Sequence, residues 1–174
     1  AEKGDNENEV NKISLLLKQA KITTEFRKTT VAARERKELA GVEAAAIELH
    51  DGTIITARSS ELLGPCSALI LNAIKHLAGI DHSVKMIPEK LIEPIQKTKV
   101  EYLHGKNPQL HTDEVLVAIS LLSNHDDNCK NALDQLPRLN GCQMHCTVMI
   151  SEVDAKVFKK LGVGVTCDPV KKRE

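Results

Sequence analysis

The chain has 174 residues, and its 24 lysines and arginines balance 24 aspartates and glutamates. Because these charges cancel, the net charge gives the chain no attraction to nucleic acid or to an anionic membrane, and we expect neither as a partner. Apolar runs such as residues 68–71 are far shorter than the ~20 residues of a membrane-spanning helix. We therefore expect a cytoplasmic protein. Its five cysteines are odd in number and lie mostly in apolar segments, which indicates reduced thiols.

The start of the chain is polar and then helical. We expect a disordered tail at residues 1–9, a helical arm at 10–41, an α/β domain at 42–170 and a short tail at 171–174. The first helix of the arm has an apolar face made of Ile13, Leu16, Leu17 and Ala20. The second helix ends at Gly41 and mixes acidic with basic side chains. That mixture indicates a solvated face rather than a nucleic-acid surface.

A change of period at Val42 predicts two strands. β-forming residues flank His50, Asp51 and Gly52, and Asp-Gly between such runs is a strong hairpin signal. The sequence therefore predicts an antiparallel hairpin at the start of the α/β domain.

The helix predicted at residues 65–79 is apolar around almost its whole circumference, so it must be buried. Asn72, Lys75 and His76 lie at positions i, i+3 and i+4. They form one narrow polar stripe, which we expect to reach solvent, a pocket or a partner. Leu69, Ile70, Ala73, Ile74 and Leu77 are expected to be almost wholly buried.

The remaining elements alternate between strand and helix. We expect a strand at 84–87, helix at 88–103 with a break near Pro94, helices at 113–122 and 126–136, a strand at 142–150, a helix at 151–162 and a strand at 163–167. Helix-linked strands favour parallel pairing with helices on both faces. The fold class is therefore predicted as a three-layer α/β sandwich with a mixed sheet and an N-terminal helical arm.

Three blocks of sequence, residues 53–80, 92–120 and 133–163, closely resemble the C-terminal part of the bacterial proteins called domain of unknown function 1846. The resemblance implies a cytidine-deaminase-like topology. It also implies a longer parent protein whose other portion carries a phosphate-loop-like motif. A nucleotide would then be a cofactor of the parent, with no cofactor held by this chain itself. Family positions match here at Ser60, Gly64, Asn72, Asn107, His111, Asp113, Glu114 and His145.

A metal site is not expected. A zinc deaminase needs His-x-Glu and Pro-Cys-x-x-Cys, and neither motif is present, nor is His-Glu-x-x-His. Cys142, His145 and Cys146 have ligand-like spacing, but on a strand His145 points to the face opposite the two cysteines. Buried structural side chains explain them better than a metal does. His145 remains a candidate ligand-binding residue.

The densest cluster of reactive side chains runs from His111 to Glu114. His111, Asp113 and Glu114 are candidate catalytic residues, because an imidazole that titrates near neutrality lies beside two carboxylates. Lys106 and Asn107, in the loop before them, are candidate ligand-binding residues. The alternative is a helix start with Thr112 as the N-cap residue and two acidic residues in the first turn.

The start of the buried helix offers a similar choice. Ser60 and Gly64 precede free backbone N–H groups that can receive an anion, and ordinary capping explains the same residues. Two functions remain open. In the first, the domain completes the ligand or active site of a larger nucleotide-dependent enzyme. In the second, it is a non-catalytic docking or oligomerisation module that binds the remainder of its parent chain or further copies of itself.

Overall fold

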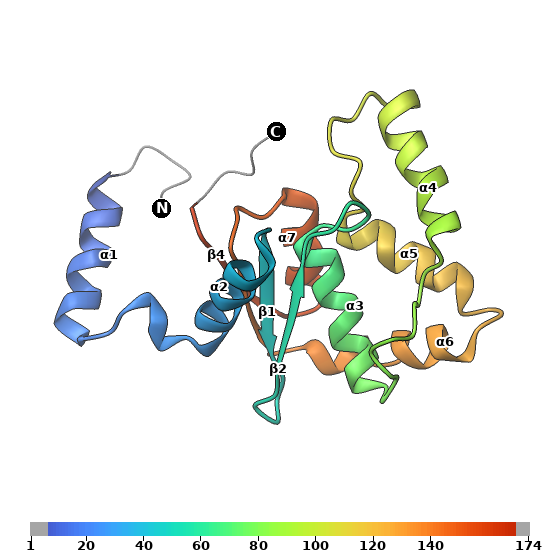
Figure 1. Ribbon diagram of the computed structural model, residues 1–174. Helices are drawn as coiled ribbons and strands as arrows, with labels where there is room; N and C mark the ends of the chain where they lie inside the picture. The colour runs from blue at the N-terminus through green and yellow to red at the C-terminus, as the bar shows by residue number, and fades with distance from the viewer. Residues whose placement is uncertain (1–6, 170–174) are drawn as a thin grey trace.

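The structure, a computed structural model, describes residues 7–169. Residues 1–6 of the predicted N-terminal tail, residue 170 of the predicted α/β domain and the predicted tail at 171–174 lie outside the described residues. Its strands form one four-stranded sheet in the order β2-β1-β3-β4 (Figure 1). The strands are β1 (Ala44–Glu48), β2 (Ile54–Arg58), β3 (Gln143–Cys146) and β4 (Gly164–Cys167). β1 pairs antiparallel with both β2 and β3, whereas β3 and β4 are parallel. The predicted mixed sheet is confirmed.

The described residues also form seven α-helices. They are α1 (Glu7–Ala20), α2 (Lys28–Ala40), α3 (Pro65–Leu77), α4 (Glu89–Lys97), α5 (Thr112–Leu122), α6 (Asp127–Leu133) and α7 (Glu152–Lys160). Shorter helical segments are η1 (Thr24–Phe26), the π-helical η2 (Thr98–Tyr102) and η3 (Leu136–Leu139). Residues 7–9, which were expected to belong to the tail, are helical.

The predicted hairpin is present. The turn between β1 and β2 contains Gly52 with a φ of 83°, a conformation that glycine adopts without strain. Asp51 stabilises the turn because its Oδ1 accepts a hydrogen bond of 2.9 Å from the backbone N–H of Thr53. The turn leaves β2 at one edge of the sheet, and its outer side pairs with no strand of the described chain.

Helices cover both faces of the sheet. α3 packs against β1 and β2 from one face, and α2 packs against β1, β2 and β3 from the other. As a result, Ala44, Ala45, Ala46 and Ile47 of β1 are all buried, with 0–1% of each exposed. The predicted layering of helix, sheet and helix is therefore confirmed.

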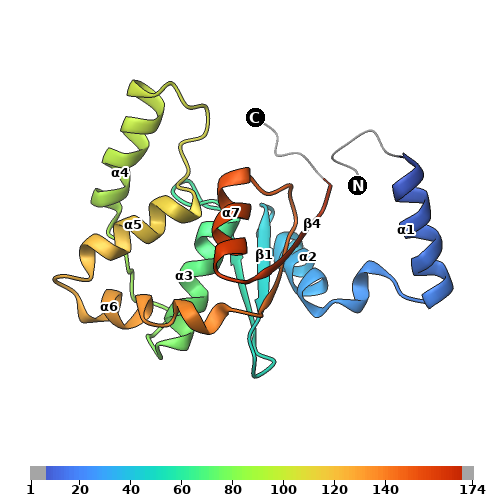
Figure 2. The same cartoon turned by 180° about the vertical axis from the view of Figure 1, so that it is seen from behind.

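The helix α2 is solvated on its charged side only. Its mixed charges predicted a solvated face, and Glu35 and Glu38 are exposed, but Thr29, Thr30 and Ala33 are buried on its inner side. Three small side chains make a weak apolar signal, yet they allow the helix to lie close to the sheet. α2 thus forms one layer of the fold, while α1 stands apart from it (Figures 1 and 2).

α3 forms the centre of the hydrophobic core, as predicted. Leu69, Ile70, Ala73 and Ile74 are 0–1% exposed. Leu77 in the last turn is only half-buried, because the chain turns away at Gly79 directly after it. The polar stripe of α3 lies beside β2, where Asn72 Nδ2 donates a 3.0 Å hydrogen bond to the carbonyl oxygen of Thr56.

The strand predicted at residues 84–87 is not formed. Met86 and Ile87 enter the core from a loop instead. The carbonyl groups of His82 and Val84 accept hydrogen bonds of 2.8 and 2.6 Å from Lys75 Nζ. A lysine therefore satisfies backbone groups that a neighbouring strand would otherwise satisfy.

The break expected near Pro94 is also absent. Pro94 lies inside α4, and the helix departs from α geometry only at η2. In an α-helix the N–H of residue 94 would bind the carbonyl oxygen of Lys90, but proline has no N–H. Lys90 is exposed to solvent.

The parallel pair β3 and β4 with α7 between them is as predicted. The cytidine-deaminase-like topology stays a prediction, and no helix among the described residues is long and apolar enough to cross a membrane.

Candidate functional site

His111 begins α5 as its N-cap residue, one position before the predicted Thr112. Its backbone N–H donates a 2.7 Å hydrogen bond to Glu114 Oε2, which also accepts a 2.7 Å ion-paired hydrogen bond from Lys99 Nζ. Asp113 Oδ1 accepts a hydrogen bond from the backbone N–H of Glu114. Both predicted catalytic carboxylates are therefore bound to the first turn of their own helix.

Asp154 of α7 joins this helix start to a second one. Its Oδ1 accepts hydrogen bonds from the backbone N–H and the hydroxyl of Thr112, at 2.8 and 2.7 Å. Its Oδ2 accepts a 2.7 Å hydrogen bond from Ser151 Oγ, the N-cap side chain of α7, and lies 3.3 Å from His111 Nδ1. We call these residues, with Glu114, the helix junction.

The junction holds strongly perturbed acids and bases. Burial by itself would raise the pKa of Asp154, but the hydrogen bonds from His111, Thr112 and Ser151 lower it from 3.8 to about 2. The hydrogen bond to Asp154 raises the pKa of His111 above 6.5 against the opposing effect of burial. Serine, histidine and aspartate thus meet at one place.

Their arrangement differs from a nucleophile triad. In a triad the serine hydroxyl donates to one imidazole nitrogen, and the aspartate binds the other. Here Ser151 Oγ donates directly to Asp154, and the same atom of His111, Nδ1, faces both groups at 3.3–3.4 Å. In this geometry Ser151 caps α7 and Asp154 binds the start of α5, so the two side chains hold two helix ends together. The catalytic roles of His111, Asp113 and Glu114 stay predictions.

The two predicted ligand-binding loops lie side by side. Leu110 pairs with Leu63 in an isolated bridge, and its N–H donates a 2.9 Å hydrogen bond to the carbonyl of Leu62. Gln109 Nε2 hydrogen-bonds to the carbonyl oxygen of Ser60, and Ser67 Oγ donates to the Leu110 carbonyl at 2.8 Å. The sequence placed these loops 40 residues apart without indicating that they meet.

Within these loops, the predicted residues mainly bind neighbouring backbone. Ser60 Oγ accepts hydrogen bonds from the N–H groups of Leu62 and Leu63. Asn107 Oδ1 accepts one from the N–H of Gln109. Gly64 is the N-cap residue of α3, and Lys106 is exposed.

A cavity of about 720 Å³ runs along the free edge of β2, between α2 and α3. We call it the basic groove. Its polar lining residues are Arg36 of α2, Thr56 and Arg58 of β2, Ser60, Asn72, Lys75 and His76 of α3, and His82. None of the residues that line it is acidic. Two predicted residues, Ser60 and Asn72, therefore lie in a cavity with three cationic side chains.

The cations of the groove differ in how they are paired. Arg36 Nε is buried and has no hydrogen-bond partner among the described residues, whereas its neighbours Arg34 and Lys37 form ion pairs. Arg58 donates only to the carbonyl of Ser59, at 3.3 Å. Burial lowers the pKa of Lys75, whose ammonium group is bound to backbone carbonyls. A buried guanidinium nitrogen without a partner is unusual, and an anion would satisfy it.

Little in the sequence indicates this groove. Arg36 belongs to the mixed-charge helix that was expected to be solvated, and Arg58 ends a strand. Neither position has a spacing signal, because the groove is made by three elements that only the folded sheet brings together. The one available signal was the polar stripe of α3, which does reach a pocket.

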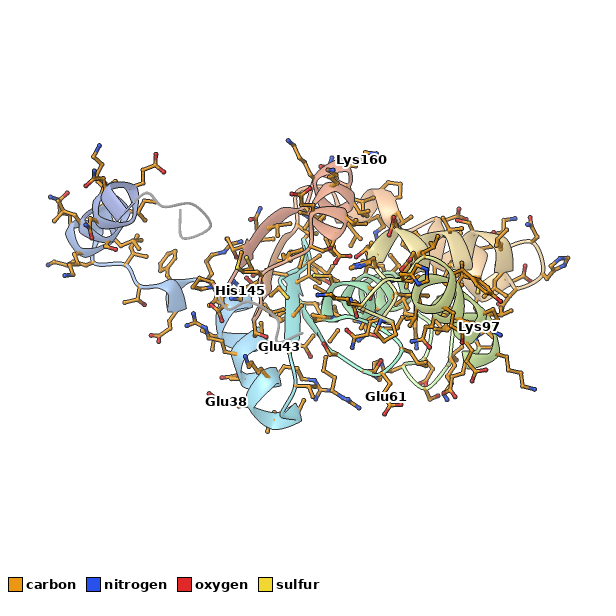
Figure 3. All side chains as sticks on the ribbon, turned by 90° about the horizontal axis from the view of Figure 1, so that it is seen from above. Glu38, Glu43, Glu61, Lys97, His145 and Lys160 are labelled. Carbon is orange, nitrogen blue, oxygen red and sulfur yellow. The ribbon has the colours of Figure 1, made fainter. Side chains whose placement is uncertain are left out.

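His145 occupies a separate place. Its side chain is 4% exposed and lies on the side of the sheet from which α1 and η1 project (Figure 3). It is within reach of Thr166 and Asp168, near the β4 edge. Cys142 and Cys146 point to the opposite face, into the α3 core. Among residues 7–169 no group of three His, Cys, Asp or Glu side chains is placed to hold a metal ion.

Comparison with known proteins reveals close relatives. Residues 25–174 match the family model "Domain of unknown function DUF1846, C-terminal". The chain is 44% identical over 170 residues to a UPF0371 protein of Corynebacterium aurimucosum, covering 98% of this chain and 34% of the relative. It is 42% identical over 165 residues to a UPF0371 protein of Streptococcus sanguinis, covering 95% of this chain and 33% of the relative.

The chain therefore spans about a third of the length of the curated relatives it matches. The names of these relatives describe no activity. Since the family model covers most of the sequence, the chain belongs to the DUF1846 family and corresponds to its C-terminal domain.

Proposed function

We propose that this domain supplies an anion-binding surface, the basic groove, to a larger nucleotide-dependent enzyme. The observation that carries the proposal is the excess of positive charge in the groove: cationic side chains from three elements face one cavity, and none of the described residues that line it is acidic. The phosphate groups of a nucleotide are the matching ligand, because guanidinium groups bind phosphate oxygens with two parallel hydrogen bonds.

The length of the relatives supports a shared site. Two thirds of their sequence lies outside the region that this chain matches, so a ligand in the groove can also contact another part of the parent. Thr56, Asn72 and Ser60 offer the groove hydroxyl and amide groups for the uncharged part of such a ligand. The nucleotide dependence and the implied deaminase-like topology rest on the family resemblance.

The experiment is a calorimetric titration of the 174-residue chain with inorganic pyrophosphate and with ATP. Arg36→Met and Arg58→Met remove one charge each while keeping an apolar stem of similar length. We expect each to weaken pyrophosphate binding about tenfold, as the loss of one charge-assisted contact does. Raising the ionic strength should weaken binding to the unaltered protein as well.

Lys160→Met is the matched control, because Lys160 is exposed on α7, away from the groove (Figure 3). It should bind pyrophosphate like the unaltered protein. Equal loss in all three variants would mean that only net charge attracts the anion, and the groove would not be a site. ATP binding tighter than pyrophosphate would support a nucleotide.

The second candidate is a non-catalytic docking or oligomerisation domain. One observation favours it: the apolar side chains of α1 are largely exposed, with Ile13 at 49%, Leu15 at 57% and Leu16 at 62%. A docking domain has no need of an anion site. Absence of pyrophosphate binding, with the chain eluting as a dimer or binding the rest of its parent, would therefore favour this candidate.

A further inference from the structure

The first helix, α1, carries an apolar face that the described chain leaves uncovered. Along this face Ile13 and Leu16 are exposed, and Leu17 is half-buried. No strand and no other helix of residues 7–169 packs extensively against α1, which stands apart from the layers of the fold (Figures 1 and 2). Apolar side chains that stay in water forgo the free energy of burial, and neighbouring exposed ones mark an interaction surface.

The sequence nevertheless encodes α1 as a helix with a defined end. The backbone N–H of Ile22 donates a 3.0 Å hydrogen bond to the carbonyl oxygen of Leu17, and that of Lys21 donates one of 3.1 Å to Lys18. Lys21 has a φ of 52°. These two bonds around a left-handed residue form the Schellman turn that closes many helices.

A closed end does not by itself make α1 stable. The helix has 14 residues, a length that is marginal for a helix alone in water. Most helices in proteins are stabilised by packing of their apolar face. The described residues do not supply this packing, so we look for it outside them.

Comparison with relatives places α1 outside the C-terminal domain. The family model begins at residue 25, after the end of α1. The match to the Corynebacterium aurimucosum protein covers 170 of the 174 residues, so it cannot leave out the 14 residues of α1. The helix is therefore shared with a relative about three times as long as this chain. Because the matched domain is the C-terminal one, the larger portion of such a relative precedes it.

A second copy of the chain fits this face poorly. Stable interfaces between separate molecules bury roughly 800 Å² on each partner. The face of α1 offers far less, since it consists of Ile13, Leu16, Leu17 and Ala20. A portion of the same polypeptide needs less contact area, because the connecting residues keep it at a high effective concentration.

We propose that α1 is structurally a helix of the preceding portion of the parent and packs its apolar face against an apolar surface there. The boundary between the two portions then lies at residues 21–23, between α1 and η1. With so short a connection, the turn at Lys21 sets the direction in which the C-terminal domain leaves the preceding portion. α1 lines no part of the basic groove, so this joint is independent of the anion site and compatible with either candidate function.

The test compares backbone hydrogen exchange of α1 in the 174-residue chain and in the full-length parent. We expect residues 12–20 to exchange at least about 100-fold more slowly in the parent, because packing allows exchange only through larger openings. Equal exchange in the two proteins would overturn the proposal. So would protection in the 174-residue chain that rises with protein concentration, since the face would then belong to a second copy.

Leu16→Asp tests the packing itself, and Leu39→Asp is the matched control because Leu39 is 82% exposed on α2. In the 174-residue chain, neither substitution should change the denaturant concentration at the midpoint of unfolding. In the parent, Leu16→Asp should speed exchange of the α1 amides at least about tenfold, and Leu39→Asp should leave it unchanged. If Leu16→Asp prevents the parent from folding, Leu16→Ala replaces it, with a smaller increase expected. Equal exchange in the Leu16 and Leu39 variants contradicts the proposal.

Discussion

The helix junction and the basic groove are both rich in charged side chains, but they treat those charges differently. At the junction, Asp154 accepts hydrogen bonds from side chains or backbone of three residues, and Glu114 accepts from two. In the groove, Arg36 Nε has no hydrogen-bond partner and no lining residue is acidic within residues 7–169. Charges that satisfy one another stabilise the fold, whereas charges without partners are available to a ligand.

This difference also shows that a perturbed pKa does not by itself identify a functional site. Hydrogen bonds at the junction lower the pKa of Asp154 to about 2, yet every group that lowers it is already bound in the fold. The groove is identified instead by a buried arginine nitrogen that has no hydrogen-bond partner among the described residues. A perturbed acid identifies a ligand site only when part of its bonding capacity remains unused.

The basic groove depends on the packed helix α3 as its frame, because α3 lines the groove on one side and forms the core on the other. Leu69→Ala should produce the largest effect. Leu69 is 0% exposed, so the cavity left behind should lower the free energy of unfolding by ~2–5 kcal/mol. Chemical denaturation measures this change. A loss below about 1 kcal/mol would mean that α3 is not the packed frame described here.

Much of this frame was predictable because local patterns determine it. Asp51 and Gly52 indicated the hairpin, and the apolar circumference of residues 65–77 indicated the buried helix. The strand predicted at 84–87 failed because Lys75 binds its carbonyl groups, a contact between a helix and a distant loop that no period reveals.

The candidate site was less predictable for the same reason. Asp154 lies more than 40 residues from Thr112, and nothing in the sequence around either one indicates that they meet. Arg36 appears in a helix whose charges alternate, so only the packing of α2 on the sheet shows which of its cations is unpaired. Residue types were visible in the sequence, but partners were not.

The junction should show its structural role through pH. The folded pKa of Asp154, about 2, is below the ordinary 3.8, so its contribution is present above pH 3.8 and is lost as the pH falls through about 2. The shift corresponds to about 2 kcal/mol. The pKa of His111 is raised above 6.5, so its contribution is present below pH 6.5 and is lost as the pH rises through the folded value.

Denaturation measured across pH should therefore show greatest junction stability between pH 3.8 and 6.5. Asp154→Asn should lower the free energy of unfolding by about 2 kcal/mol within that window and remove its decrease at acid pH. His111→Ala should remove the decrease in the free energy of unfolding at alkaline pH. Pyrophosphate binding should be unchanged in any variant that folds. If His111→Ala kept its stability and lost ligand binding, the predicted catalytic role would be favoured over the cap.

The smallest effect on stability should come from the groove itself. Arg36 and Arg58 carry like charges and line the same cavity, and Arg36 Nε is buried without a hydrogen bond among the described residues, so removing either charge takes away a cost as well as a contact. We expect Arg36→Met and Arg58→Met to change the free energy of unfolding by less than about 0.5 kcal/mol. Any change should be toward greater stability at low ionic strength, where repulsion is least screened.

Arg34→Met is the matched comparison for this last prediction, since Arg34 is two positions from Arg36 on the same helix and is paired with Asp168 at 2.7 Å. It should lower the free energy of unfolding by about 1 kcal/mol, because the half-buried Asp168 carboxylate loses its arginine partner. Denaturation of the three variants at low and high salt measures the difference. A loss above about 1 kcal/mol in Arg36→Met would show that Arg36 supports the fold as the junction residues do, and the distinction between paired and available charges would no longer hold for this groove.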